Sequence, residues 1–362
     1  MKNTELCTAM AALSQQNSPS LAAAPFADRF ISADNCFTLL RYAFALAIFC
    51  NHMCYVSGRD IFLCYGGVFV QGFFVMSGFL TMNSYVRRDN WHDYAFRRMR
   101  RILPGYISAV LICFVLGLIF TTLPLADFFS HADTWKYLVA NLAFLNFLQP
   151  SLPGVFEDHA LIVMNSSLWT MKIEVLFYVS VPFVVWMMKR WRPTWVLTII
   201  TLLSWIWFTI MEYLFKTTDK EIYYTLNHQI MGELQFFYFP VLLWWHRDWV
   251  RRHERVLCTI AVVLLVLSYS WWRDASLLNF YTLSVLILIV AYRLEPIVHA
   301  RRWKDVSYEF FLLRFPLLQV CVVLMPTASL GVLAAVSLPT LIVASILLNV
   351  WCKIVSKSLK SR

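Results

Sequence analysis

Long apolar runs constrain the fold of this chain more than any other feature of its sequence. About ten of them are long enough to cross, as α-helices, the roughly 30 Å hydrocarbon core of a membrane. Only 14% of the residues are charged, against about 25% in ordinary soluble domains, and 60% are hydrophobic. The sequence therefore predicts an all-α, polytopic integral membrane protein with spans near residues 37–57, 62–86, 105–123, 167–188, 194–214, 226–245, 256–272, 276–293, 306–325 and 329–352.

Basic residues between these runs indicate how the helices are oriented. They gather after the second, fourth, sixth, eighth and tenth spans, whereas the alternate loops hold few of them. Because Lys and Arg accumulate in cytoplasmic loops, this pattern predicts that both termini are cytoplasmic. The net charge of +10 is explained by this topology, so we expect no nucleic acid partner.

The remaining segments predict one membrane domain flanked by an N-terminal extension and a short C-terminal tail. Residues 1–35 are polar and lack the charged and apolar regions of a cleavable signal, which predicts a loose N-terminal extension. Residues 36–354 form the expected transmembrane domain, and residues 355–362 a basic cytoplasmic tail. The run Tyr137–Leu148 is too short to span and is predicted to be re-entrant or interfacial. The nine cysteines contain no zinc-type pair, so we expect no metal site.

The first span carries two polar residues that a membrane helix would normally exclude. Arg41 and His52 are eleven residues apart, so they lie on the same face of a helix, about 16 Å apart along its axis. Such residues are unfavourable in hydrocarbon unless their face lines a polar cavity. We therefore expect the other spans to build a cavity beside this face.

Other polar residues are expected at membrane depth. With the predicted topology, His52 and Glu174 both lie in the outer half of the membrane, on the first and fourth spans. Arg41 lies in the inner half, where a guanidinium could bind an anion that enters from the cytoplasm. Arg314 lies near mid-membrane on the ninth span. A potential base and a carboxylate are thus expected to face each other.

The second span combines glycines with a cluster of arginines. Five of the ten glycines fall within 21 residues at its start and middle, which favours close packing of helices or of a ligand. Arg97, Arg98 and Arg101 follow this span among apolar residues. They predict an amphipathic interfacial segment, ended by Pro104, that could meet phospholipid or a phosphorylated ligand.

Five motifs in this order and spacing resemble those of the integral-membrane acyltransferase family 3, whose members acylate surface and exported glycans. The resemblance covers nearly the whole chain from residue 37 to residue 320. The motifs are Arg41-x10-His52, GVFVQGFFVMSGF from Gly67 to Phe79, RRMRRILP from Arg97 to Pro104, SLWTMKIEVLFY from Ser167 to Tyr178, and SYEFFLLRFP from Ser307 to Pro316.

The resemblance implies an acyl-CoA dependent O-acyltransferase. A multi-pass enzyme of the bacterial cytoplasmic (inner) membrane would move an acyl group, most often acetyl, from cytoplasmic acyl-CoA to a hydroxyl of a lipid-linked or exported glycan. A lipopolysaccharide or an exopolysaccharide would be such an acceptor. We expect acyl-CoA, the glycan acceptor and membrane lipids as partners, and no permanently bound cofactor. The oligomeric state is not indicated.

The resemblance also suggests roles for individual residues. His52 would act as general base on the acceptor hydroxyl, and Glu174 would orient it. Arg41 would bind CoA phosphates, together with Arg97, Arg98 and Arg101. Ser77 is a less favoured covalent route, and Tyr178 and Arg314 are further candidates.

Two departures from the family pattern matter. The last motif usually has a histidine before Phe-Pro, and here Arg314 stands at that position. The role of that histidine is therefore not transferred, although Arg314 could bind an anion. Members often carry an appended esterase-like domain, which this sequence lacks, so we expect acceptor specificity to reside in the membrane domain and its outer loops.

Each candidate also has a simpler structural interpretation. His52 could join two helices, Glu174 could pair with Lys172, and Arg41 could extend to the inner interface. The arginine cluster could be a topology signal alone, and Ser77 a packing residue. A polytopic transporter or flippase for a glycan or lipid-linked substrate is the main alternative function, although no repeat of broken helices is evident. A membrane interaction protein without activity is the weakest alternative.

Overall fold

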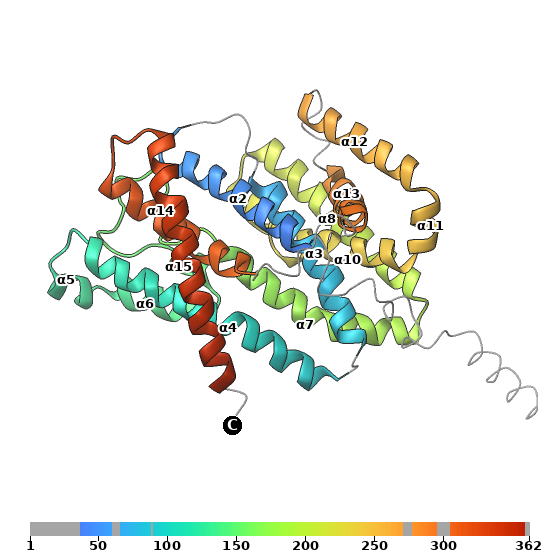
Figure 1. The fold of residues 1–362 in the computed structure, drawn as a ribbon, viewed down its shortest axis with the longest axis horizontal. Helices are drawn as coiled ribbons and strands as arrows, with labels where there is room; N and C mark the ends of the chain where they lie inside the picture. The colour runs from blue at the N-terminus through green and yellow to red at the C-terminus, as the bar shows by residue number, and fades with distance from the viewer. Residues whose placement is uncertain (1–36, 60–65, 88–89, 271–276, 295–304, 359–362) are drawn as a thin grey trace, which may run out of the picture.

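The computed structural model describes residues 37–59, 66–87, 90–270, 277–294 and 305–358, and all the regular structure in these ranges is helical (Figure 1). The long helices are α2 (Phe37–Val56), α3 (Gly66–Val86), α4 (Trp91–Phe120), α7 (Trp169–Arg190), α8 (Pro193–Thr218), α10 (Ile230–Trp245), α12 (Glu254–Ser270), α13 (Asn279–Leu294), α14 (Ser307–Leu324) and α15 (Leu330–Ser358). Shorter helices between them are α5 (Leu125–Ser130), α6 (Ala132–Leu142), η4 (Asn146–Leu148), α9 (Glu221–Asn227) and α11 (Arg247–Arg252). The proposed N-terminal extension lies outside the described residues.

A helix occupies each of the ten predicted apolar runs, which confirms an all-helical fold over the described ranges. Within those ranges, six helices are both long and apolar enough to cross a membrane: α2, α4, α7, α8, α14 and α15. Helices α10, α12 and α13 have only 16 or 17 residues. The count of ten spans, the domain boundaries and the cytoplasmic placement of both termini therefore remain predictions.

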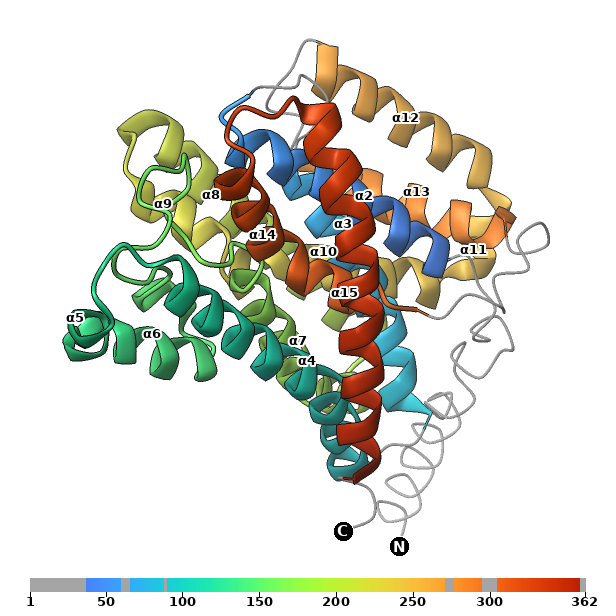
Figure 2. The ribbon, with the colours of Figure 1, turned by 60° about the vertical axis from the view of Figure 1, so that its left-hand side comes forward.

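The long helices form one bundle with α3 and α10 near its centre. Helix α14 packs against α2 and α15, and also contacts α4. Figures 1 and 2 both show α5 and α6 along one side of the bundle beside α4, and α12 on the opposite side. This arrangement brings the consecutive helices α2, α3 and α4 together with α7 and with α14 from near the end of the chain.

One glycine in the second motif explains the tight contact at the bundle centre. A Cβ atom added to Gly78 on α3 would overlap the backbone carbonyl of Phe237 on α10. Only a residue without a side chain allows the two backbones to approach this closely, as in other membrane helix pairs. The small residue expected from the sequence thus fixes the spacing of α3 and α10.

The prediction that the arginine segment ends at Pro104 was wrong, because Pro104 lies inside α4, which runs for 30 residues from Trp91 to Phe120. Proline has no N–H group, so the carbonyl of Arg100, four residues earlier, loses its helical partner. The hydroxyl of Ser356 on α15 donates a hydrogen bond to that carbonyl across 3.0 Å. A residue 256 positions away thus supplies the missing donor, and the helix continues.

The run Tyr137–Leu148 forms the end of α6 and the single turn η4. The hydroxyl of Tyr106 on α4 donates to the carbonyl of Asn141 at 2.6 Å, and the Asn141 amide donates to the carbonyl of Gln149 at 2.9 Å. These bonds fasten the segment to the side of α4. Its predicted re-entrant or interfacial position relative to the membrane stays a prediction.

Candidate functional site

A small cavity lies where α2, α3, α4, α7 and α14 meet. Its volume is about 100 Å³, enough for several water-sized groups. Six of the residues singled out from the sequence line it together: Arg41, Ser77, Arg98, Arg101, Glu174 and Tyr178. We call this space the arginine cavity. The expectation that the face of Arg41 lines a polar cavity is confirmed for Arg41.

Glu174 is the acidic centre of the arginine cavity. The hydroxyl of Ser77 on α3 donates a hydrogen bond to Oε1 of Glu174 across 2.6 Å. The hydroxyl of Tyr178, one turn further along α7, donates to the same oxygen. The carboxylate is therefore held between two helices by two hydroxyl groups, and it fixes the direction of the Ser77 hydroxyl.

Three arginines surround this carboxylate and give the cavity a cationic character. The guanidinium of Arg98 lies 5.0 Å from the ring centroid of Tyr178 and 5.5 Å from that of Tyr94. Arg101 is exposed and marks the edge of the cavity. Arg41 lies beneath them on α2. Arginine is well suited to bind phosphate groups, because its planar fork can donate two parallel hydrogen bonds.

Asp305, just before α14, is a residue that the sequence reasoning missed. Its carboxylate forms an ion pair with the guanidinium of Arg41 and accepts hydrogen bonds from the backbone N–H and the hydroxyl of Ser307, at 3.1 and 2.6 Å. Burial alone would raise the pKa of Asp305, but Arg41 and Ser307 together hold it below its ordinary value. The signal was an aspartate directly before an apolar helix, a position where such residues commonly bind free N–H groups.

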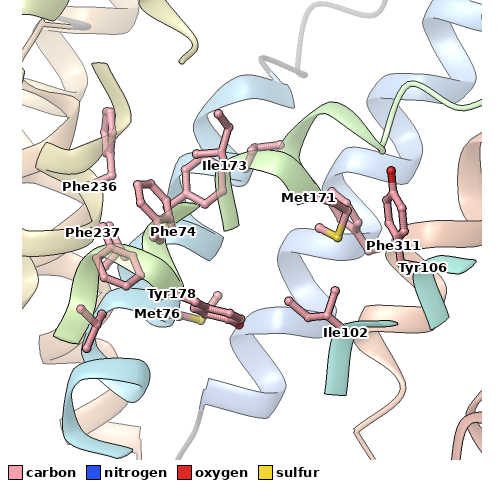
Figure 3. Packing of buried hydrophobic residues seen from close by; sticks show 14 of the residues in the cluster. Phe74, Met76, Ile102, Tyr106, Met171, Ile173, Tyr178, Phe236, Phe237 and Phe311 are labelled. Carbon is pink, nitrogen blue, oxygen red and sulfur yellow. The ribbon is translucent and has the colours of Figure 1, made fainter. Parts of the chain in front are cut away.

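Apolar and aromatic side chains make up much of the rest of the arginine cavity. Met76, Ile102, Met171, Tyr178 and Phe311, all labelled in Figure 3, line it from four helices, α3, α4, α7 and α14. Ligand pockets of whole drug-sized molecules commonly measure about 300–1,000 Å³. The smaller space here would admit a small acyl group or one end of a larger ligand.

His52 does not belong to this set of lining residues. Arg314 on α14 donates a hydrogen bond from Nε to Nδ1 of His52 across 3.3 Å. The His52 ring also packs edge-on against Phe315, with centroids 5.1 Å apart. The expected pairing of His52 with Glu174 is therefore wrong: within the described structure, Glu174 bonds to Ser77 and Tyr178 instead.

The Arg314 contact determines which nitrogen of His52 carries its proton. A guanidinium is always a donor, so Nδ1 must be the acceptor, and the proton of a neutral ring lies on Nε2. Arg314 is buried, with 1% of its surface exposed, and its Nη1 atom has no hydrogen-bond partner among the described residues. One further acceptor could therefore be bound there.

Phe311 lies between the arginine cavity and the His52–Arg314 pair. Its side chain lines the cavity, and the guanidinium of Arg314 lies 3.9 Å from its ring centroid. The three side chains Phe311, Arg314 and His52 thus form a continuous series that leads away from the cavity. Movement of one aromatic ring would connect the two polar sites.

The segment that precedes α7 packs against α14. The amide of Asn165 donates to the carbonyl of Leu312 at 2.9 Å, and the amide of Gln319 donates to the carbonyls of Leu161 and Val163 at 2.7 and 3.0 Å. His159 contacts the Gln319 side chain. This segment is thus fastened to α14 on both sides of Arg314 in the sequence, at Leu312 and at Gln319.

Other sequence candidates lie elsewhere. Arg97 is not among the residues that line the arginine cavity. In the described structure, Lys172 donates to the side chain of Gln229 and does not pair with Glu174. The simpler interpretation, in which Glu174 pairs with Lys172, is therefore not supported. Within the described residues, no group of three or more His, Cys, Asp or Glu side chains gathers in a way that could hold a metal ion.

Comparisons with known proteins agree with the motifs. A family model described as "Acyltransferase domain" matches residues 34–354. The chain is 25% identical over 302 residues to an "O-acetyl transferase" of Shigella phage Sf6, covering 80% of this chain and 86% of that protein. It is 22% identical over 281 residues to "Nodulation protein 10" of Rhizobium leguminosarum bv. viciae, covering 71% and 73%. No solved structure matches the chain at a significant level.

Proposed function

The chain belongs to acyltransferase family 3, and from this premise we propose that it transfers an acetyl group from acetyl-CoA to a hydroxyl of a lipid-linked or exported cell-surface glycan, as a multi-pass enzyme of the bacterial inner membrane. The family match supports the general class, a membrane O-acyltransferase. The donor, the acceptor and the acyl group are the further steps of the proposal.

The observation that carries the proposal is the arginine cavity. Three arginines, one carboxylate and several hydroxyl groups line a small space inside a helix bundle, together with apolar side chains. Arg41, Arg98 and Arg101 would bind phosphate groups of CoA at the end of the cavity that faces the cytoplasm. The small volume favours a short acyl group over a long one.

The pantetheine arm would extend from the cavity past Phe311 towards His52. Arg41 and His52 are separated by about 16 Å along α2, a length that an extended arm has to bridge. Glu174 would balance the charge of the arginines and hold Ser77 and Tyr178 in place. In this scheme the arginine cavity binds the donor, and the acyl group is transferred at the His52–Arg314 pair.

The transfer step would need a change in the His52–Arg314 contact. Nδ1 of His52 becomes free to accept the proton of the acceptor hydroxyl when Arg314 turns to the carbonyl oxygen of the thioester. The acceptor oxygen then forms a bond to the acyl carbon, the carbon–sulfur bond breaks, and the thiolate takes the proton from His52 and leaves as free CoA. General-base assistance of this kind contributes roughly 10²- to 10⁴-fold in rate.

Mass spectrometry of surface glycans tests the proposal. Cells that produce the wild-type protein should carry an acetyl group that is missing when the gene is deleted, and His52→Ala should not restore it. Membrane insertion and the amount of the variant must match the wild type. If no acyl group depends on the protein but glycan export does, the chain is a transporter or flippase and the proposal is wrong.

A further inference from the structure

A second and larger cavity lies between α2, α14 and α15, separate from the arginine cavity. Its volume is about 780 Å³, and it opens to the side of the bundle. Val306 lines this groove, whereas the next residue, Ser307, lines the arginine cavity. Figures 1 and 2 show α15 extending along α14 and beyond it, so the groove follows a long, outward-facing helix. We call it the α15 groove.

An aliphatic stripe runs along the floor of the α15 groove. Five aliphatic residues of α15 recur at four-residue spacing and lie on one face: Leu338, Ile342, Ile346, Val350 and Ile354. The stripe is about 24 Å long, which exceeds one leaflet of a membrane. Ile346 and Ile354 are 48% and 58% exposed, and Ala45 and Phe310 close the opposite wall. An occupant must therefore be long and apolar.

One end of the α15 groove is cationic. Lys353 and Lys357 are its only charged residues among the described lining, and they lie one helical turn apart near the end of α15. The carboxylate of Glu309, which interacts electrostatically with Lys353, also accepts a hydrogen bond from Asn349 at 2.9 Å. The groove thus combines an aliphatic channel with two ammonium groups at a helix end.

We propose that the α15 groove binds an anionic glycerophospholipid, with one acyl chain along the aliphatic stripe and the phosphate between Lys353 and Lys357. A free phosphate would leave the apolar channel empty, and a neutral lipid would bring no net negative charge to the two lysines. Basic pockets between membrane helices bind anionic head groups in this way. The proposal is independent of the acyltransferase reaction.

Native mass spectrometry of the purified full chain tests the binding. The probe is phosphatidylglycerol, mixed with phosphatidylcholine in the micelles or nanodiscs. We expect the wild type to retain one phosphatidylglycerol molecule in preference to phosphatidylcholine. Each lysine near the surface contributes about 1 kcal/mol to attraction of anionic lipid, so Lys353→Gln/Lys357→Gln should weaken retention by about 25-fold. Lys189→Gln/Arg190→Gln removes the same charge from the end of α7 and should retain the lipid.

A pair of adjacent substitutions tests the channel itself. Ile346→Trp fills the α15 groove and should abolish retention, whereas Leu347→Trp, on the neighbouring face and 65% exposed, should not. Equal retention by both tryptophan variants and by both charge variants would overturn the proposal, because the lipid would then bind elsewhere.

A photo-crosslinking side chain at Ile346 identifies the occupant. In membranes that contain phosphatidylglycerol, the expected product is a phospholipid adduct of the single chain. A crosslink to a peptide from residues 1–36, or to a second copy of the chain, would assign the groove to a protein segment and overturn the proposal.

Discussion

Nε of Arg314 on α14 donates a hydrogen bond to Nδ1 of His52 on α2 across 3.3 Å. The contact joins the first and last of the recognised motifs and places a permanent cation beside a histidine. It also occupies the nitrogen that a general base would use. Catalysis by His52 therefore requires that Arg314 changes its partner during the reaction, and the two residues should depend on each other.

Removal of the His52 imidazole should nearly abolish transfer. We expect kcat of His52→Ala to fall by roughly 10²- to 10⁴-fold, because the acceptor hydroxyl loses its base. Transfer of radiolabelled acetyl groups in proteoliposomes would measure this. His92→Ala, at the exposed start of α4, is the matched control and should keep full activity. An active and folded His52→Ala protein would contradict the assignment.

Substitution of Arg314 by lysine keeps the charge but removes the Nε donor. Lysine cannot reproduce the planar fork that contacts both His52 and a second acceptor. Loss of a charged hydrogen bond is worth about 1.5–3 kcal/mol, which corresponds to roughly 10- to 150-fold in kcat. Arg293→Lys, at an exposed position of α13 where the arginine pairs with Glu254, is the control. If Arg314→Lys affects only KM for acyl-CoA, Arg314 acts in donor binding and not in transfer.

Arg41, Arg98 and Arg101 should determine the affinity for the donor. Each change to glutamine removes a phosphate contact, so KM for acetyl-CoA should rise by about 10-fold or more, with a smaller change in kcat. Arg100→Gln, on the same helix but outside the cavity lining, should leave KM unchanged. Titration with CoA and with 3′-dephospho-CoA shows which phosphate each arginine contacts. Unchanged KM in all three variants would exclude the arginine cavity as the donor site.

We expect substitutions at Glu174, Ser77 and Tyr178 to reduce activity together, because hydrogen bonds join the three side chains. Glu174→Gln replaces a charged acceptor by a neutral amide beside three arginines, and we expect the largest loss of activity of the three. Ser77→Ala and Tyr178→Phe each remove one of two hydroxyl donors to Oε1 and should reduce kcat by roughly 5- to 15-fold. Complete loss in Ser77→Ala, together with a labelled acyl-protein in the wild type, would instead establish a covalent route through Ser77.

The Arg41–Asp305 ion pair should make the thermal stability of the protein depend on pH. The pKa of Asp305 is lowered in the folded protein, so the stabilisation is fully present above its ordinary value of 3.8 and is lost as the pH falls through the lower folded value. Acidification from about pH 5 to about pH 3 should therefore lower the Tm of the wild type more steeply than that of Asp305→Asn. Parallel curves for the two proteins would show that the ion pair contributes little.

The sequence was informative wherever a polar residue interrupts an apolar run. Arg41 and Glu174 were found in this way, since a charge in hydrocarbon requires a polar partner. The arginines of α4 were identified as a basic cluster after the second span, and Ser77 and Tyr178 from the family motifs. Six of these candidates line one cavity. Apolar length and composition also placed a helix at every predicted span, because helices satisfy their own backbone groups in lipid.

The sequence did not predict which of these residues contact one another. His52 and Glu174 were assigned to one depth by counting residues from the ends of their spans, which assumes parallel helices with aligned ends. The bundle instead brings Glu174 to Ser77 and leaves His52 with Arg314. Such contacts depend on tilt and on close approaches such as that of Gly78, which sequence periodicity does not report.

The bond from Ser356 to the carbonyl of Arg100 has a consequence for biogenesis. α15 is synthesised after every other described helix, yet it supplies the hydrogen bond that lets α4 continue past Pro104. The donor that replaces the bond lost at Pro104 can therefore reach Arg100 only after the chain has been synthesised to residue 356. The arginine cavity is lined by Arg98 and Arg101 of α4 and also by Ser307, Tyr308 and Phe311 of α14, so its complete lining cannot come together before α14 has been made.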